Sequence, residues 1–243
     1  SISGANIVLN TAVAESLRQY ADALEKAEDF NETLHALIRD TIRSHKRIIF
    51  NGNGYDGAWV EEAQRRGLLN LKTTPDCLPY FTSPKNIALF AAHKVFSETE
   101  IRARYDILLD NYSKIINIEA VTMLDMSKKD LLPAYSAYAR CLGETINAKK
   151  AALSGVDCTY EEEQLKKISA LCGCMYQKAQ ALEDALLHLD QIECDGLARA
   201  KYYQQTVLSA MNELRIAADE MESVAGRSFY PYPNYGDLLF GVR

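Results

Sequence analysis

The chain has 243 residues, of which 48% are apolar and 25% charged, a composition that excludes a generally disordered chain. No apolar run approaches the roughly 20 residues of a membrane-spanning helix, so we expect none. The net charge of −6 arises entirely after residue 97, because residues 1–97 carry 11 basic and 11 acidic side chains. An acidic surface repels phosphate backbones, which argues against nucleic acid as a partner.

The cysteine usage predicts a reducing compartment. Six cysteines occur in a chain long enough to build its own core, and its first residues carry no basic segment typical of a signal peptide. We therefore expect free thiols and a cytoplasmic protein.

The first 97 residues read as short helices. We expect helices over residues 5–27, from an N-cap at Asn31 to near Arg47, over 58–66 with its end at Gly67, and over 85–93. Residues 47–50 are the one strand candidate, because they are rich in β-prone side chains. Residues 68–84 contain three of the six prolines and predict an ordered loop.

Long helices follow, each introduced by a predicted capping box. Ser97 with Glu100 opens the first, in which apolar residues recur at steps of three and four as far as Leu142. We expect a kink or a break in it at Pro133. Residues 154–158 then predict a turn.

The second long helix, opened by Thr159 with Glu162, carries the clearest periodicity of the chain. Its apolar residues keep the a/d spacing of a heptad seam over roughly four heptads. They are Leu165, Ile168, Cys172, Met175, Ala179, Leu182, Leu186 and Leu189. A last helix, with Val207, Met211, Leu214, Ala218 and Met221 on one stripe, stops at Gly226.

These elements predict a mainly α fold. A seam of this kind needs partner helices, so we expect an up-and-down antiparallel bundle over residues 98–225, preceded by a helical segment 1–97 with at most one short strand. The aromatic tail, residues 226–243, must dock somewhere. Because the bundle is acidic outside, we expect the tail to dock as an extended strand against residues 1–60; the alternative is a neighbouring subunit.

One glycine motif resembles a nucleotide-binding turn in its letters. Gly52, Gly54 and Gly57 have the spacing of the dinucleotide fingerprint between a β-prone run and a helix. No second strand follows, and Asp76 lies in the proline-rich segment instead of at a strand end. A tight structural turn is the favoured interpretation.

Three further groups contain residues with possible chemistry. They are Glu32 with His35, Cys172 and Cys174 with His188 and Cys194, and Arg39 with Arg43 and Arg47. The first is half of a di-iron carboxylate motif whose other half is missing, which argues against a ferritin-type oxidase. The second has the wrong spacing for zinc. The third complements a helix C-terminus better than it makes an anion site.

Several segments from one end of the chain to the other resemble the C-terminal part of type III glutamine synthetase, the long-chain bacterial class. The segments are 1–6, 8–11, 48–55, 59–63, 70–76, 83–90, 116–120 and 235–240. Residues 141–225 carry no motif that can be matched to this family. Their assignment depends on their helical pattern alone.

The resemblance implies an ATP-dependent ligase that joins ammonia to glutamate with Mg²⁺ or Mn²⁺, in a large ring-stacked homo-oligomer whose subunits share active sites. Residues 1–97 would end its catalytic domain, 98–225 would form an added helical domain and 226–243 a docking tail. The strands with the metal-binding glutamates and the substrate arginines would lie before Ser1. We therefore assign no catalytic, cofactor-binding or metal residue here, and expect no ATP or metal on this chain.

Two hypotheses about function follow from this. In the first, the chain is a C-terminal piece of a glutamine synthetase, structural or involved in oligomerisation and inactive alone, with other subunits and an unidentified regulatory protein as its partners. In the second, it is a free-standing coiled-coil adaptor, which the heptad seam supports. The reading frame upstream of Ser1 would separate them.

Overall fold

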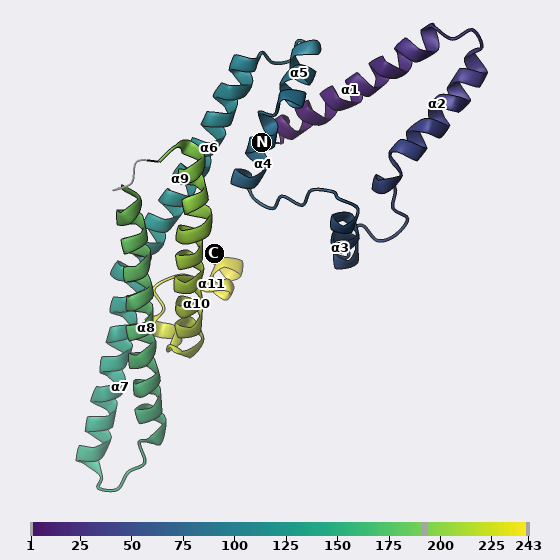
Figure 1. Ribbon diagram of the computed structural model, residues 1–243. Coiled ribbons are helices and arrows are strands. Elements are labelled where there is room, and N and C mark those ends of the chain that lie inside the picture. Colours follow the sequence, from purple (N-terminus) through teal and green to yellow (C-terminus); the bar gives the residue numbers. More distant parts are fainter. Residues whose placement is uncertain (1, 191–193, 242–243) are drawn as a thin grey trace. The chain divides into compact units, whose positions relative to one another are not determined.

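Helices make up the regular structure of the computed structural model, which describes residues 2–190 and 194–241 (Figure 1). Within those residues there is no strand, so the predicted mainly α fold is confirmed. The β-prone run forms a 3₁₀ turn, Lys46–Ile48, and then extended backbone. The chain divides into two compact units, residues 1–108 (unit 1) and residues 109–243 (unit 2), and each is described by itself.

Unit 1 consists of short helices joined by turns and loops. They are α1 (Ser3–Glu25), α2 (Phe30–Ser44), α3 (Gly57–Arg65), α4 (Thr74–Phe81), α5 (Pro84–Ala92) and the beginning of α6 (Glu98–Asp125). The predicted cap at Asn31 is wrong by two residues. Asp29 caps α2, because its extended backbone lets its carboxylate accept the Glu32 N–H at 2.9 Å.

The predicted loop over residues 68–84 is wrong in its middle, where α4 forms. Pro75 lies in the first turn of α4, where a missing N–H costs nothing because the N–H groups there have no intrahelical partner. The Thr73 hydroxyl donates to the Asp76 carboxylate at 2.5 Å and supports that turn. The helix also accommodates Pro79. Gly67 ends α3 as predicted, with a φ of 74° that favours glycine.

The small core of unit 1 is aromatic. Phe90 is 1% exposed and packs against Phe81 and Phe96, with ring centroids 5.8 and 5.4 Å away. His93 Nε2 lies 2.7 Å from Glu15 Oε2, a contact that ties α5 to α1. These side chains hold together the part of unit 1 in which α1, α4 and α5 meet.

Unit 2 is a bundle of long helical segments that run antiparallel (Figure 1). The second half of α6 continues through a π-helical turn, Met126–Leu131, into α7 (Leu132–Ala152). After α8 (Thr159–Asp190), the chain forms α9 (Gly196–Tyr202), a π-helical turn over Tyr203–Val207 and α10 (Leu208–Val224). Helix α8 packs against both α7 and α10.

The expected kink or break at Pro133 takes another form. Pro133 lies in the first turn of α7, directly after the π-helical turn, and the chain stays helical throughout. A π turn shifts hydrogen bonding to i→i+5 and can accommodate a residue that cannot donate an N–H. The helix therefore absorbs the proline without ending.

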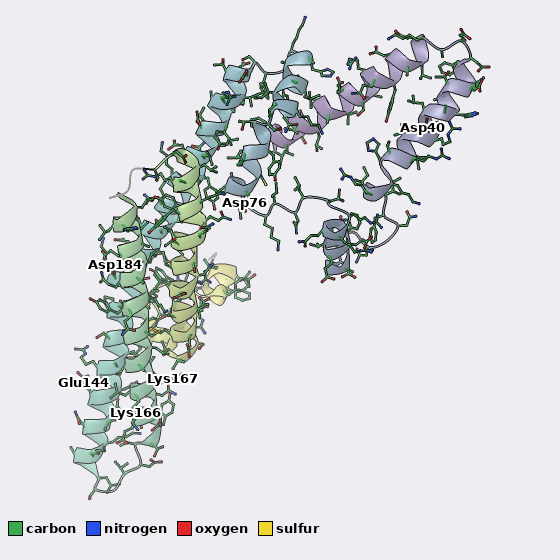
Figure 2. The ribbon with its side chains drawn as sticks, in the orientation of Figure 1. Asp40, Asp76, Glu144, Lys166, Lys167 and Asp184 are labelled. Carbon is green, nitrogen blue, oxygen red and sulfur yellow. The ribbon has the colours of Figure 1, made fainter. Side chains whose placement is uncertain are left out.

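The heptad seam of α8 forms the centre of unit 2, as its spacing predicts. Ile168, Met175, Ala179 and Leu182 are each 0% exposed, and Leu189 is 2% exposed. The side chains that pack around this seam come from all the other long helices of unit 2, which are α6, α7 and α10, and from the two π-helical turns. Charged side chains cover the outside, among them Glu144, Lys166, Lys167 and Asp184 (Figure 2).

One predicted capping box is confirmed and the other is wrong. Ser97 N–H donates to Glu100 at 2.8 Å and the Ser97 hydroxyl accepts the Glu100 N–H at 3.3 Å. In place of the Thr159 box, Asp157 accepts hydrogen bonds from the Thr159 N–H and hydroxyl at 2.9 and 2.7 Å. Glu162 instead pairs with Lys150 across the turn at 2.6 Å.

The predicted docking of the tail is also wrong in form and in place. Instead of an extended strand against residues 1–60, the tail forms a 3₁₀ turn, Arg227–Phe229, and the short helix α11 (Tyr235–Phe240). Phe229 packs on Tyr138, with ring centroids 5.1 Å apart, and Tyr230 and Tyr232 pack against the core of unit 2. The bundle, although acidic, offers apolar surface between its charged side chains.

Candidate functional site

A cavity of about 520 Å³ opens between the bundle of unit 2 and the docked tail. Its apolar lining comes from α6, the following π-helical turn and α10: Ile118, Met123, Met126, Leu131, Met211, Leu214 and Ala218. Tyr230 and Tyr232 of the tail complete the wall. The cavity therefore exists because the tail docks where it does.

One buried hydroxyl in the cavity wall lacks a partner. Tyr135 on α7 is 0% exposed, and its hydroxyl makes no hydrogen bond among the described residues. Burial raises the pKa of Tyr135, and the charges of Tyr230 and Glu222, both of which line the cavity, raise the pKa further.

The rim of the cavity is acidic. Arg215 on α10 pairs with Asp219, at 2.6 Å between Nε and Oδ1, and its charge also interacts with Glu222, so one cation faces the three lining carboxylates of Glu119, Asp219 and Glu222. Burial and the neighbouring Glu222 raise the pKa of Tyr230. The site is thus a concave, largely apolar pocket with a few polar groups, the form typical of small-ligand sites.

The tail tyrosine Tyr232 is fixed by a long-range hydrogen bond. Its hydroxyl donates to Asp130 Oδ2 at 2.8 Å, a contact that joins the tail to the π-helical turn. Burial and this carboxylate raise the pKa of Tyr232 to about 12. Tyrosine hydroxyls with raised pKa values stay protonated at neutral pH, so this site offers hydrogen bonds and not a nucleophile.

Sequence reasoning missed this cavity. Its lining residues lie between 118 and 232 and meet only because the bundle folds and the tail returns to it. The sequence contained one related signal, which is Pro133 inside a predicted helix. The structure places a π-helical turn over residues 126–131 just before this proline, and turns of this kind recur at functional sites.

The glycine motif is a structural turn. The Phe50 ring stacks on Trp59 at 4.2 Å between centroids, and a Cβ on Gly52 would lie 2.5 Å from that ring. Asp56 caps α3, so a carboxylate occupies the helix end at which a phosphate would bind. The backbone here is shaped by the packing of Phe50.

The other candidates from the sequence are not assembled into sites. Glu32 and His35 are exposed on α2. Cys172 lies on the seam, where burial raises its pKa, whereas Cys174 is exposed. His188 lies 14 residues beyond Cys174 on the same helix, about 21 Å along its axis at 1.5 Å per residue.

The arginines near the end of α2 serve local pairing. Arg39 donates to Asp40 at 3.3 Å, and Arg43 lies in the last turn, 4.0 Å from the same carboxylate. Arg47 lies in the 3₁₀ turn, and its carbonyl accepts a hydrogen bond from the Arg66 guanidinium at 3.2 Å. The three do not converge on one point as an anion site requires.

Residues 2–190 and 194–241 bring no three histidine, cysteine or carboxylate side chains together in a way that would hold a metal ion. All six cysteines are free. None of the described helices has the length and apolar composition needed to cross a bilayer.

These features define a protein that is helical throughout its regular structure in the described residues, with a concave and largely apolar cavity in unit 2. The family model of the glutamine synthetase C-terminal domain matches residues 33–150, which include parts of both units. The resemblance to the C-terminal part of glutamine synthetase that the sequence showed is confirmed.

Curated relatives extend the match over most of the chain. A glutamine synthetase of Butyrivibrio fibrisolvens is 41% identical over 216 residues, which are 89% of this chain and 31% of the relative. A type-3 glutamine synthetase of Dictyostelium discoideum is 32% identical over 240 residues, 96% of this chain and 33% of the relative. A glutamine synthetase of Bacteroides fragilis is 25% identical over 248 residues. The chain thus spans about a third of the length of these relatives.

Proposed function

We propose that this chain is the C-terminal part of a type III glutamine synthetase, which ligates ammonia to glutamate with ATP and a divalent metal ion. The observation that carries the proposal is the match of 89% of the chain to only 31% of the Butyrivibrio fibrisolvens glutamine synthetase. The remaining two thirds would supply the nucleotide, the metal ligands and the substrate groups.

In this proposal the part played by unit 1 is to pack against the rest of the catalytic domain. Leu9, Val13 and Leu17 form one stripe along α1 and are 63%, 57% and 61% exposed. They recur every four residues and therefore share a helix face. Burying a Leu or Val side chain contributes about 1.5–3 kcal/mol, so a stripe of this kind favours a partner surface.

Unit 2 would serve assembly. Ile115, Ile118 and Val121 on α6 and Ile216 on α10 are at least half exposed, and scattered apolar residues of this kind can contribute to contacts between subunits of a homo-oligomer. In this proposal the bundle supports the ring and does no chemistry. The chain alone would be inactive, because phosphoryl transfer needs metal ions and cations that the other part provides.

A chimera tests the proposal. The matched third of the Butyrivibrio fibrisolvens glutamine synthetase is replaced by this chain, and glutamine formation is measured with glutamate, ammonia, ATP and Mg²⁺. We expect turnover well above background from the chimera and background from the chain alone. A soluble, correctly assembled chimera without activity, or turnover by the chain alone, would contradict it.

A second chimera identifies which surface matters. Leu9, Val13 and Leu17 are each changed to Gln, and Leu187, which is exposed on unit 2 outside the residues assigned to assembly, is changed to Gln in a control. If unit 1 packs on the catalytic core, the triple variant loses activity and assembly while the control keeps its activity.

The alternative of a free-standing coiled-coil adaptor lacks a free seam. The seam residues Ile168, Met175, Ala179 and Leu182 are fully buried inside unit 2. A coiled-coil partner would need exactly that surface, since knobs and holes come from the a and d positions. We therefore do not propose it.

A further inference from the structure

We propose that the cavity of unit 2 is a binding site for a small organic amine, a ligand with an apolar body and a positively charged ammonium group. The site lies outside anything implied by the ligase reaction, and the proposal stands or falls independently of the function proposed above.

The size and lining of the cavity fit an apolar body. At about 520 Å³ it falls within the range of small-molecule pockets. Three methionines, Met123, Met126 and Met211, contribute to the lining. Methionine side chains are flexible and polarisable, so they adapt to varied apolar shapes. Tyr230 and Tyr232 add aromatic faces, on which an ammonium group can be stabilised.

The Tyr135 hydroxyl supplies a directed polar contact. It is buried and has no partner in the described part of the chain, and a buried polar group of this kind calls for an explanation such as a missing ligand. A phenolic oxygen can accept a hydrogen bond from an ammonium N–H. The hydroxyl oxygen is itself buried, so in this proposal the flexible methionine side chains of the lining shift to let a bound amine donate to it.

The charge of the rim selects a cation over an anion. The ionisable groups that line the cavity, apart from the tyrosines, are Glu119, Arg215, Asp219 and Glu222. Arg215 and Asp219 neutralise each other at 2.6 Å, so two carboxylates remain. Beyond the lining, Asp130 holds Tyr232, and Asp125 and Lys129, which form an ion pair with each other, lie near it. An anionic ligand would meet repulsion here, whereas an ammonium group is attracted.

The apolar and the charged groups of the cavity lie in different places, and each matches one end of the proposed ligand. Methionine and leucine side chains provide the apolar surface, and the carboxylates lie on the exposed rim. Most of the affinity would come from burying the apolar body, while the rim charge determines which sign of ligand is accepted.

Three probes of similar size test the proposal on the 243-residue chain. They are 2-phenylethylamine, its neutral counterpart 2-phenylethanol and the anion 3-phenylpropanoate, each titrated at pH 7 while NMR shifts of the methionine methyl groups are followed. We expect saturable shifts at Met123, Met126 and Met211 with the amine, weaker binding of the alcohol and the weakest binding of the anion. No saturable binding of the amine, or equal binding of all three, would overturn the proposal.

Matched variants locate the binding. Tyr135→Phe should weaken amine binding about fivefold to tenfold through the lost hydrogen bond, whereas Tyr138→Phe, a buried tyrosine outside the lining, should not. Glu222→Gln should weaken amine binding about twofold to fivefold and leave the alcohol unaffected. Glu220→Gln, on the same helix but outside the lining, is its control.

A filling variant separates the cavity from the outer surface. Ala218→Leu adds a larger side chain to the lining and should abolish saturable binding of the amine. Circular dichroism and the melting temperature report whether the variant is folded. Unchanged binding to a folded Ala218→Leu protein would place the amine elsewhere and refute the site, as would equal effects of Tyr135→Phe and Tyr138→Phe.

Discussion

Two buried tyrosines of unit 2 differ in whether their hydroxyls have a partner. Tyr135 is 0% exposed and its hydroxyl has no partner among the residues that the structure describes, whereas Tyr203 is 3% exposed and donates to Asn117 Oδ1 at 3.1 Å. An unsatisfied buried polar group costs about 1–3 kcal/mol, and a typical hydrogen bond contributes about 0.5–1.5 kcal/mol. The same chemical change at the two positions should therefore have opposite effects.

We predict that Tyr135→Phe raises the free energy of unfolding of the ligand-free chain, by up to about 1 kcal/mol, because it removes an uncompensated hydroxyl. Tyr203→Phe should lower it by about 0.5–1.5 kcal/mol, because Asn117 loses its donor. Urea denaturation followed by circular dichroism measures both. Equal destabilisation by the two variants would show that the Tyr135 hydroxyl has a partner after all.

The contact between Glu15 and His93 predicts a pH dependence within unit 1. Hydrogen bonds from Arg18, Gln19 and His93 hold the pKa of Glu15 well below its usual value of 4.5. A carboxyl with a lowered pKa stabilises the fold fully above the pKa of the unfolded chain, and this contribution declines as the pH falls from there through the pKa of the folded state. Glu15→Gln should therefore destabilise unit 1 more at pH 7 than at pH 3. Hydrogen exchange of α1 amides measures this, and a difference that grows on acidification would contradict it.

The seam of α8 shows the difference between buried and exposed leucines on one helix. Leu182 is 0% exposed, whereas Leu187 is 55% exposed. Leu182→Ala should lower the free energy of unfolding by about 2–5 kcal/mol, because it removes apolar contacts and leaves a cavity. Leu187→Ala should change it by less than about 0.5 kcal/mol. Thermal melts of the two variants separate the outcomes, and similar losses would mean that α8 packs in another register.

The tail has one half that docks and one that does not. Phe229, Tyr230 and Tyr232 are half-buried on the bundle, whereas Leu238 and Phe240 of α11 are 67% and 82% exposed. Deleting residues 235–243 should leave the melting temperature of unit 2 nearly unchanged. Deleting residues 226–243 should lower it by several degrees, because half-burial of three rings is worth roughly 3 kcal/mol. A large loss from the shorter deletion would show that α11 is the part that docks.

The predictions made from sequence were right where the signal was local. The seam from Leu165 to Leu189 and the Ser97 box depend on residues within a few positions of one another, so their spacing was enough. Helix α4 was missed because three prolines in residues 68–84 indicate a loop, although Pro75 is compatible with a first helical turn.

The tail and the cavity were missed because their contacts are not local. Tyr232 reaches Asp130 across 102 positions, and no pattern along the chain encodes that pairing. The acidic composition suggested that the bundle could not hold an aromatic tail. Charge counts describe an average surface, whereas docking depends on the apolar patches between the charges.

At the scale of the whole molecule, the two units differ in how much they bury. Unit 2 has a contiguous core built from all its long segments, whereas the buried side chains of unit 1 gather around Phe90 and Leu78. Local stability follows the density of buried apolar contacts, and regions with few of them open at low free-energy cost. Helices α2 and α3 contain no buried residue at all.

We therefore predict two levels of protection from hydrogen exchange in the isolated chain. Amides of α8 around Met175 and Leu182 should exchange only through global unfolding of unit 2, and amides of α2 and α3 should exchange orders of magnitude faster. Mass spectrometry of exchanged peptides at pH 7 measures both. In the active chimera, the α1 peptides that contain Leu9 and Val13 should become more protected than in the isolated chain, because their exposed stripe is then covered. Equal protection of α1 in both proteins would mean that the stripe does not pack on the catalytic core, even if the chimera is active.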